Sequence, residues 1–377
     1  MSELRIIGNE TVRKLLDATI SGGRISHAQL FSAPEGVGAL HIAIDYALKA
    51  LGAGEEKMFS HPDLHYVFPV NTNKDVKKSP VSDDFLPLWQ KFVTEHPYGS
   101  LADWYAMMDI ENKQGIIGKE EAESIAKKLS LKSFSGGYRA VVIWHGEKMN
   151  QTAANKLLKL IEEPGERTLI IIVTDDAGAV LPTISSRCQK VEFRHIGQDE
   201  IYDCLVRQYG TASDTARRIA HGADGDMGRA LKMLSGGSHE EAFPELFVRF
   251  VRHAFMAKKR PQELNNLLVW ASDVSALSRE SQKHFLEYAC GVFRQGLMNN
   301  YGVTELVLPQ DFPAGFNFGG FSQYVPRTDG RPIPYRAQRK LENGVFRHGG
   351  QDNALPARQT RMTDTIMQEI LRKWKTY

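Results

Sequence analysis

Residues 28–51, AQLFSAPEGVGALHIAIDYALKAL, join a short apolar segment, a turn with two glycines and an alanine-rich run. The segment Ala28–Phe31 is typical of a buried strand. The run from residue 39 to about Leu51 has the composition and the apolar spacing of a helix. This strand–turn–helix unit predicts an α/β domain in which the turn follows the carboxyl end of a strand.

Further strands and helices alternate on both sides of this unit. Strands are expected at Leu64–Val70, Ala140–Trp144, Thr168–Thr174 and Lys190–Phe193, with helices at Lys119–Leu129 and Gln151–Ile161. Because parallel strands need long crossover connections, this alternation predicts a mostly parallel, helix-covered sheet through about residue 195. The stretch from Asn71 to about Asn112 is polar, aromatic and punctuated by prolines, and we interpret it as an insertion.

The two ends of the chain are predicted to be helical. Asn9 precedes apolar residues at helical spacing, so we expect it to cap a first helix. After residue 195, helices are expected at Gln198–Tyr209, Asp214–Ala220 and Met227–Leu234, then from Glu240 to about Asn299, and last at Thr363–Trp374. Residues 300–356 are rich in glycine and proline and predict an irregular segment. The expected domains are therefore 1–195, 196–238 and 239–377.

Composition limits the class of protein. The chain has 377 residues, of which 42% are hydrophobic and 24% charged, as in ordinary globular proteins, and this excludes a disordered, collagenous or coiled-coil chain. The longest apolar stretches are too short to span a bilayer, and the first residues lack the features of a signal peptide. Cys188, Cys204 and Cys290 lie too far apart for a disulfide framework. A cytoplasmic protein without membrane contact is expected, and the net charge of +2 does not indicate nucleic-acid binding.

The turn after the first strand stands where a phosphate-binding P-loop would stand. A working P-loop, G-x-x-x-x-G-K-[ST], uses its lysine on phosphates and its hydroxyl on magnesium. The corresponding positions here begin at Ala33 and include Gly36, Gly38, Ala39 and Leu40. Ala39 and Leu40 can neither bind phosphate nor ligate a metal. Two interpretations stay open: an ordinary strand–turn–helix, or a degenerate P-loop that has lost its chemistry.

The expected partner of a P-loop is a strand that ends in magnesium-binding acids. The strand Ala140–Trp144 is followed by His145 and Gly146 instead, and Glu147 comes too late to take the place of the first acid. A histidine beside a tryptophan at a strand end is more often a packing feature than a base. The loss at both halves of one site predicts that no cofactor and no metal is bound.

Two motifs resemble those of bacterial clamp-loader subunits of the AAA+ family. Residues 149–164, MNQTAANKLLKLIEEP, resemble the helix after the acidic motif, and residues 181–188, LPTISSRC, resemble the Ser-Arg-Cys motif. The openings at 7–10 and 27–31 fit as well, so the resemblance covers roughly residues 1–235. The segments 61–65 and 82–87 are similar to the insertion of Bacteroidetes-type members.

The resemblance implies a fold and a role. The implied fold is an AAA+ (P-loop NTPase-like) α/β domain with a helical lid, followed by an all-α collar domain. The implied role is that of a non-hydrolysing member of the DNA polymerase III clamp loader, which loads the sliding clamp at primer–template DNA. Its expected partners are gamma/tau-type ATPase subunits and the delta subunit, with the clamp and DNA as indirect partners. Arg187 is then expected to act as an arginine finger on the neighbouring subunit's nucleotide, supported by Ser186 and Cys188.

Two further family positions carry expectations. The segment 225–231 stands where active members have a sensor arginine, but Gly228 occupies that position and Arg229 is displaced by one residue. Thr174 matches the other sensor position, and without a nucleotide we expect it to be a structural hydroxyl. The cysteines of the family's zinc module are absent, and His61 and His65 supply two ligands at most.

Two other functions are weighed against this role. An active gamma/tau-type ATPase would need a lysine at Ala39 and acids at His145 and Gly146, and the chain has none of them. A stand-alone DNA-binding protein could use the segment Arg327–Arg347, in which basic and aromatic residues interleave. A solvated loop is the preferred interpretation of that segment, because the net charge is close to zero and the Ser-Arg-Cys motif is intact.

Overall fold

The computed structural model describes residues 6–110, 113–235, 242–257, 260, 262–277, 279–302 and 312–325. The chain divides into two compact units, Met1–Gly237 and Ser238–Tyr377, each described here by itself. The expected boundary between lid and collar falls at residues 236–241, outside the described residues, and the expected boundary at residue 195 lies inside the first unit. The domain limits therefore stay a prediction.

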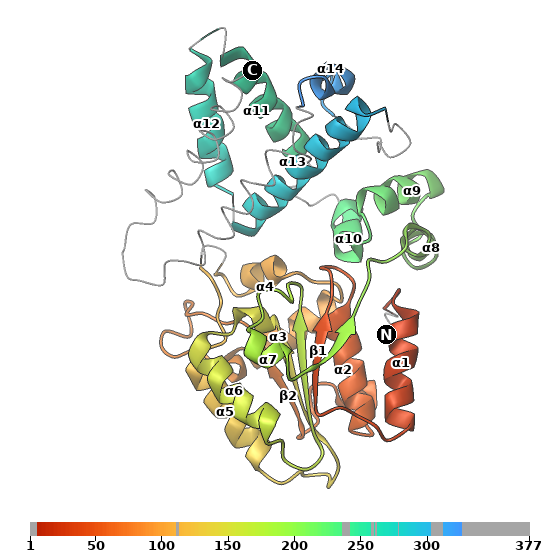
Figure 1. Ribbon diagram of the computed structural model, residues 1–377, viewed down its shortest axis with the longest axis vertical. Helices are drawn as coiled ribbons and strands as arrows, with labels where there is room; N and C mark the ends of the chain where they lie inside the picture. The colour runs from red at the N-terminus through yellow and green to blue at the C-terminus, as the bar shows by residue number, and fades with distance from the viewer. Residues whose placement is uncertain are drawn as a thin grey trace. The chain divides into compact units, whose positions relative to one another are not determined.

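The first unit is built on a parallel sheet (Figure 1). Its strands are β1 (Ala28–Ser32), β2 (Leu64–Val67), β3 (Arg139–Trp144), β4 (Thr168–Thr174) and β5 (Gln189–Glu192), in the order β2-β3-β4-β1-β5. Every neighbouring pair is parallel, and Ser32 pairs with Thr174 while Trp144 pairs with Val173. The carboxyl ends of β1, β3 and β4 therefore meet at one edge. The expected α/β fold class is confirmed.

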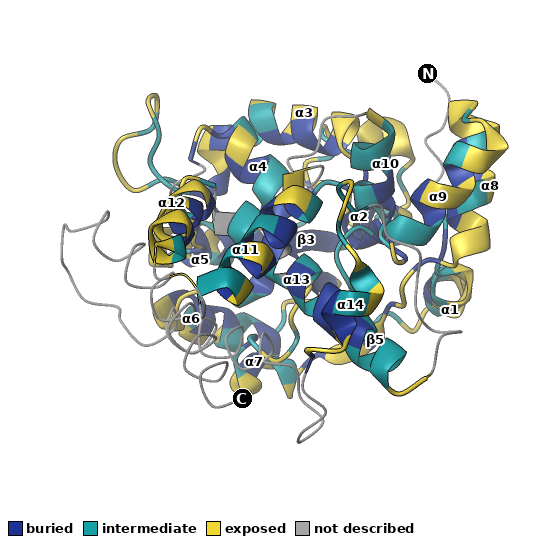
Figure 2. Ribbon diagram, turned by 90° about the horizontal axis from the view of Figure 1, so that it is seen from above, coloured by how far each residue is buried: buried dark blue, intermediate teal, exposed yellow. Residues whose placement is uncertain are grey.

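Helices cover both faces of this sheet. Alternate strand residues face opposite ways, so Phe31 and Val142 join one core whereas Leu30 and Val141 join another. The first core is closed by α1 (Glu10–Ser21) and α2 (Ala39–Ala50), and the second by α5 (Lys119–Ser130), α6 (Gln151–Glu162) and α7 (Pro182–Ser185). Figure 2 shows buried and exposed residues side by side on helices such as α6, as expected where one side of a helix faces a core. This two-sided burial explains why the central strands are continuous apolar runs.

The expected insertion is part of the core. Its described residues form a short 3-10 helix, η2 (Ser82–Phe85), and the helices α3 (Leu86–Glu95) and α4 (Leu101–Met107). Trp89, Phe92 and Trp104 are fully buried. Their rings pack against one another, and Trp89 and Phe92 also pack against Trp144 of β3. Aromatic contacts thus tie the insertion to the end of a central strand.

Asn9 is the N-cap residue of α1, as expected, but its side chain does not cap the helix. Asn9 adopts a left-handed backbone conformation, with φ at 53°, and its side chain makes no capping hydrogen bond. The amide instead pairs with the backbone of Arg194: Nδ2 donates to the carbonyl, and Oδ1 accepts from the N–H, each at 2.9 Å. Asparagine tolerates the left-handed region, and its amide group imitates a peptide that extends a strand.

Three helices complete the first unit, and four lie in the described part of the second. They are α8 (Gln198–Tyr209), α9 (Ser213–Gly222) and α10 (Met227–Ser235), then α11 (Phe243–Ala257), α12 (Glu263–Ser275), α13 (Arg279–Asn300) and α14 (Phe318–Ser322); a further 3-10 turn, η1, spans Glu55–Lys57. No helix in the described ranges is long and apolar enough to cross a membrane.

The stretch 300–356 is not irregular throughout. Its described residues are 300–302 and 312–325, and the second of these segments contains α14 and buries Phe321 and Val325 in the core of the second unit. Phenylalanines at 312, 316, 318 and 321 supply the apolar surface that the glycines and prolines of the whole stretch obscured. The segment Arg327–Arg347 and the expected helix Thr363–Trp374 lie outside the described residues.

Candidate functional site

The turn between β1 and α2 presents apolar side chains where a P-loop presents polar ones. Gly38, left-handed with φ at 74°, precedes the first turn of α2. Ala39 and Leu40 are the first residues of that helix, and both are buried. Neither carries a polar atom in its side chain, so the residues present do not fit the phosphates and magnesium that the fold family implies.

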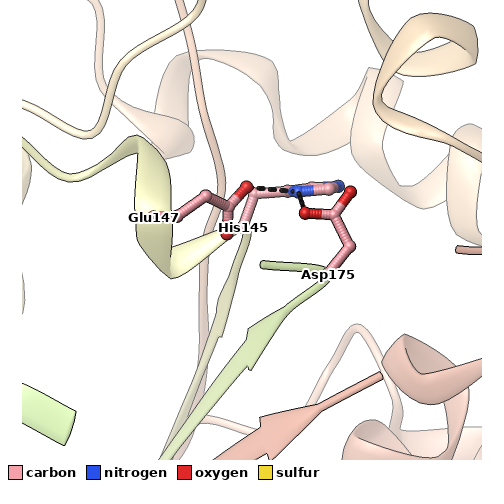
Figure 3. Close-up of side chains that lie close together, drawn as sticks. All are labelled: His145, Glu147 and Asp175. Carbon is pink, nitrogen blue, oxygen red and sulfur yellow. Dashed lines mark hydrogen bonds and ion pairs between the residues drawn. The ribbon is translucent and has the colours of Figure 1, made fainter. Parts of the chain in front are cut away.

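At the end of β3, His145 is paired with Glu147. A 3-10 turn, η3 (Gly146–Lys148), brings the Glu147 carboxylate back to the strand end. Oε1 lies 2.7 Å from His145 Nδ1, and Oε2 accepts from the Thr174 hydroxyl at 2.7 Å (Figure 3 shows the ion pair). The position of Glu147 in the sequence did not predict this contact. Thr174 ties the ends of β3 and β4 together.

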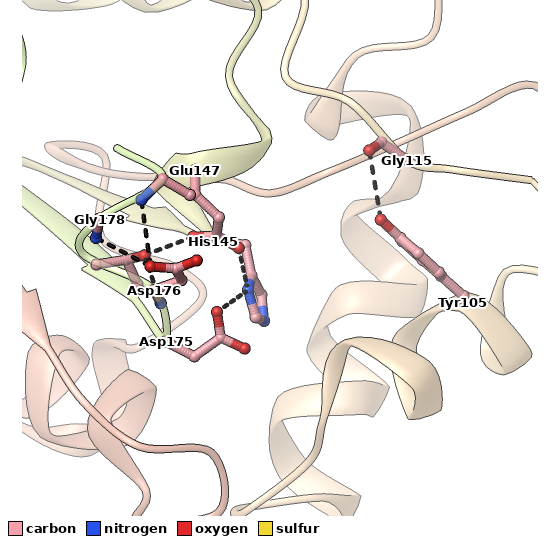
Figure 4. A network of polar contacts seen from close by, with 9 residues as sticks. Tyr105, Gly115, His145, Glu147, Asp175, Asp176 and Gly178 are labelled. Atoms are coloured by element: carbon pink, nitrogen blue, oxygen red, sulfur yellow. Dashed lines mark hydrogen bonds and ion pairs between the residues drawn. The ribbon is translucent and has the colours of Figure 1, made fainter. Parts of the chain in front are cut away.

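Asp175 joins this group from the end of β4. Its Oδ1 lies 3.8 Å from His145 Nδ1. The next residue, Asp176, turns away: its carboxylate accepts from the N–H of Gly178 and Ala179, and its own N–H donates to Thr174 Oγ1 (Figure 4). The sequence analysis missed Asp175. The signal was present, because an acid directly after a buried parallel strand lies at the carboxyl edge of the sheet.

The electrostatic state of the pair follows from its surroundings. Burial disfavours the imidazolium form of His145, but the charges of Glu147 and Asp175 outweigh it, so the pKa of His145 is raised. Burial also opposes ionisation of Glu147, yet contacts with His145 and Thr174 leave its pKa lowered. The two groups therefore form a buried ion pair, and loss of either partner would leave the other charge buried without compensation.

Gly146 has no room for a side chain. A Cβ added there would lie 2.3 Å from Ile172 Cγ2. Gly146 stands where active members of the family have their second magnesium-binding acid. Its packing against Ile172 of β4 leaves no space for an acidic side chain at this position.

The insertion and helix α10 both close over the turn. Met227 N–H donates to the Gly36 carbonyl at 3.0 Å, and Asp226 lies against Gly36. A Cβ added at Gly228 would lie 2.5 Å from the carbonyl oxygen of Tyr98, in the insertion. The position at which active family members carry a sensor arginine therefore accepts only glycine in this chain. The predicted loss of that sensor has a structural reason that the sequence did not reveal.

A small pocket remains at this edge. Its volume is about 50 Å³, below the roughly 300 Å³ at which ligand pockets begin. It is lined by residues 33–40 of the turn, 96–100 of the insertion, and 144, 145 and 173–175 of the strand ends. Burial, with a smaller contribution from Glu35, raises the pKa of nearby Asp226 to about 7. Carboxyl groups thus lie where a nucleotide would need positive charge.

Arg187 lies away from this pocket, on the surface after α7. Its Nε is 2.7 Å from Glu162 Oε1, and its Nη1 donates to the Thr183 carbonyl at 3.0 Å. Ser186 donates to the same carbonyl at 3.4 Å. Cys188 is buried, which raises the pKa of its thiol to about 11 and makes it unreactive. The three residues of the motif therefore lie together, and Arg187 alone offers a charge to solvent.

Potential metal ligands are grouped at one place in the described residues. His145, Glu147 and Asp175 form this group, and His61 and His65 do not belong to it. His61 Nδ1 accepts from the N–H of Asp63 at 3.1 Å. That these two histidines are ordinary polar residues stays a prediction.

Comparisons with known proteins point to one family. The family described as DNA polymerase III, delta subunit, matches residues 8–197. The delta' subunit of DNA polymerase III from Bacillus subtilis (strain 168) is 27% identical over 210 residues, which cover 52% of this chain and 51% of the relative. The tau subunit of the same organism is 26% identical over 234 residues, 61% of this chain and 36% of the relative.

The delta' subunit of Yersinia pestis is 34% identical over 90 residues, 24% of this chain and 26% of the relative. The chain thus spans about half, or less, of the length of these relatives. Among solved structures, a gamma subunit-related protein of Thermotoga maritima aligns over 97% of this chain and 98% of its own, with 13% identity and a TM-score of 0.40.

Proposed function

The chain belongs to the DNA polymerase III delta-subunit family, and from this premise we propose that it is a non-hydrolysing, delta-prime-type subunit of the clamp loader. In this role it would hold the shape of the ring, lend Arg187 to a neighbouring ATPase and take part in DNA replication in the cytoplasm. It would carry out no catalysis of its own, although it would serve a complex that hydrolyses ATP and a holoenzyme that makes DNA.

The observation that supports the proposal most is that the turn after β1 and the end of β3 lack the side chains that bind phosphate and magnesium. Ala39 and Leu40 replace the phosphate and magnesium ligands, and the ion pair of His145 and Glu147 occupies the end of β3. The start of α10 contacts both the turn, at Gly36, and the insertion, at Tyr98. A subunit built this way keeps one shape whether or not ATP is present.

Arg187 supports the second half of the proposal. Its side chain is 43% exposed, and its partner Glu162 is 47% exposed. Exposed ion pairs contribute about 0–1 kcal/mol, so a neighbour's phosphate can draw the guanidinium away from Glu162 at little cost. A planar, permanently charged fork is the group that suits a developing phosphoryl charge.

The proposed partners follow from the family and from the second unit. Relatives include tau and gamma/tau subunits of DNA polymerase III, and we place gamma/tau-type ATPases and the delta subunit beside this chain, with the sliding clamp and primer–template DNA as indirect partners. Helix α12 exposes Leu264, Leu268 and Val269 within its unit. Such an apolar face suits packing against the helices of neighbouring subunits.

One experiment tests the proposal directly. The isolated chain is assayed for steady-state ATP turnover and is then mixed with the gamma/tau-type ATPase of the same organism in a pull-down. We expect no turnover above the no-enzyme control, and a stable complex. Turnover that is abolished by altering residues 33–40 would show an active gamma/tau-type ATPase instead. DNA binding by the isolated chain, without complex formation, would favour a stand-alone DNA-binding protein.

A further inference from the structure

We propose that His145, Glu147 and Asp175 form a binding site for a divalent transition-metal ion of the zinc type, at the edge where β3, η3 and β4 meet. The site lies at the end of β3, where active family members have their magnesium-binding acids, but its donor atoms are different ones. The inference does not depend on the proposed role in the clamp loader, because it rests on donor atoms and their surroundings alone.

The three donor atoms have the spacing that such an ion needs. His145 Nδ1 and one carboxylate oxygen each from Glu147 and Asp175 all lie within 4.8 Å of one another. The ligand atoms of a tetrahedral zinc ion with bonds of 2.0–2.2 Å are about 3.4 Å apart. The Nδ1–Oε1 contact of 2.7 Å would lengthen, and the 3.8 Å separation of Nδ1 from Asp175 Oδ1 would shorten.

The surroundings set this group apart from surface acidic clusters. The side chains of His145 and Glu147 are only 7% and 5% exposed, and that of Asp175 is 27% exposed. The second oxygen of Glu147 accepts from the Thr174 hydroxyl, whose own oxygen accepts from the Asp176 N–H (Figure 4). The Thr174 proton is thereby directed at Glu147. Outer contacts of this kind fix a ligating carboxylate in metal sites.

The donor set selects the metal. One imidazole nitrogen and two carboxylates suit Zn²⁺, Co²⁺ or Mn²⁺, whereas Mg²⁺ and Ca²⁺ prefer oxygen ligands alone. His145 and Asp175 line the small pocket, which gives the ion a route in and leaves room for a water as fourth ligand. The proton between Nδ1 and Glu147 must leave when the metal binds, so the ion replaces the buried ion pair as the link between the strand ends.

The test uses the full chain, prepared without a histidine tag and stripped with a chelator. Zn²⁺ is titrated by calorimetry, and Co²⁺ is followed by its visible absorption, which reports tetrahedral nitrogen–oxygen ligation. We expect one ion per chain and affinity at least tenfold weaker in Asp175→Asn and Glu147→Gln. Thermal melting should show stabilisation by Zn²⁺ and none by equal Mg²⁺.

The matched control is Asp176→Asn, which makes the same change one residue along. Asp175 is partly exposed, so its variant is expected to fold, and melting curves without metal verify this for every variant. The proposal fails if no ion binds to the wild-type chain. It also fails if Asp175→Asn and Asp176→Asn bind Zn²⁺ equally well, because the ion would then be held elsewhere on the chain.

Discussion

The closed edge of the sheet and the exposed arginine after α7 are built in opposite ways. At the closed edge, polar contacts link His145, Glu147 and Thr174, and the insertion packs against the neighbouring Trp144. Arg187, in contrast, is exposed and held by one ion pair and one carbonyl. The first arrangement preserves a shape, and the second keeps a charge available to a partner. In the proposed role, both arrangements are needed: a fixed shape at the closed edge and an available charge at Arg187.

The largest expected effect belongs to the exposed arginine. In a reconstituted clamp loader, Arg187→Ala should lower ATP hydrolysis at the neighbouring site, because the developing phosphoryl charge loses its permanent counter-charge. Arginine fingers in GTPases contribute about 10³-fold or more, and the other sites of the ring reduce the observed loss. Clamp-stimulated ATPase activity and clamp loading are the measurements.

Two controls sharpen this result. Arg24→Ala removes another exposed arginine, shortly before β1, and should leave both rates unchanged. Arg187→Lys should recover little activity, because an ammonium cannot reproduce the fork of the guanidinium. Wild-type rates for Arg187→Ala in a verified complex would show that this arginine is not the finger, and its exposure would then have no role in catalysis by a neighbour.

The second effect concerns pH and the closed edge. Burial raises the pKa of Asp226 from its ordinary value of 3.8 to about 7, so the folded chain holds this proton where the unfolded chain has lost it. Folding then takes up a proton between about pH 4 and pH 7, and stability falls as the pH rises through that window. The loss from this group between pH 5 and pH 8 is on the order of 2–3 kcal/mol.

Asp226→Asn should remove this part of the pH dependence. Asparagine keeps an oxygen that can accept from the Arg229 N–H, as Asp226 Oδ1 does at 2.8 Å, so the start of α10 stays capped. Urea unfolding at several pH values measures the effect. The exposed neighbour provides the control, Asp224→Asn, which should keep the wild-type slope. Equal slopes for all three proteins would mean that Asp226 ionises as freely in the folded chain as in the unfolded one.

The third effect tests whether the lost acid can be restored. Gly146→Glu should destabilise the chain by about 1–3 kcal/mol, because its Cβ would meet Ile172 Cγ2 at 2.3 Å. It should restore no ATP turnover. Gly137→Glu is the control: a Cβ there comes no closer than 3.6 Å to another group, Ser135 Oγ. A stable Gly146→Glu variant would show that packing does not explain the glycine.

These contacts also explain what the sequence could and could not predict. The strands and their parallel arrangement followed from apolar runs that alternate with helical spacing, which are local signals. The contact of Gly228 with Tyr98, 130 positions earlier, left no local mark, nor did the return of Glu147 to Thr174. The composition of the insertion did not reveal that Trp89 and Trp104 are core residues. Contacts between segments distant in sequence determine the geometry of the site, and the spacing of apolar residues does not predict such contacts.

The smallest expected effect separates the two halves of the Arg187 contact. Glu162→Gln removes the charge that holds the guanidinium but keeps an acceptor at nearly the same place. Since both side chains are more than two-fifths exposed, the free energy of unfolding should change by less than about 1 kcal/mol. If Glu162 pairs with Arg187 only while no neighbour engages the arginine, the ATPase activity of the neighbouring subunit should stay within about twofold of wild type. If the variant instead loses as much activity as Arg187→Ala, with the complex intact, then Glu162 positions the guanidinium for its role in the neighbouring site.

The double variant decides between these outcomes. A positioning residue adds nothing to the loss caused by Arg187→Ala, whereas an independent contribution would add to it.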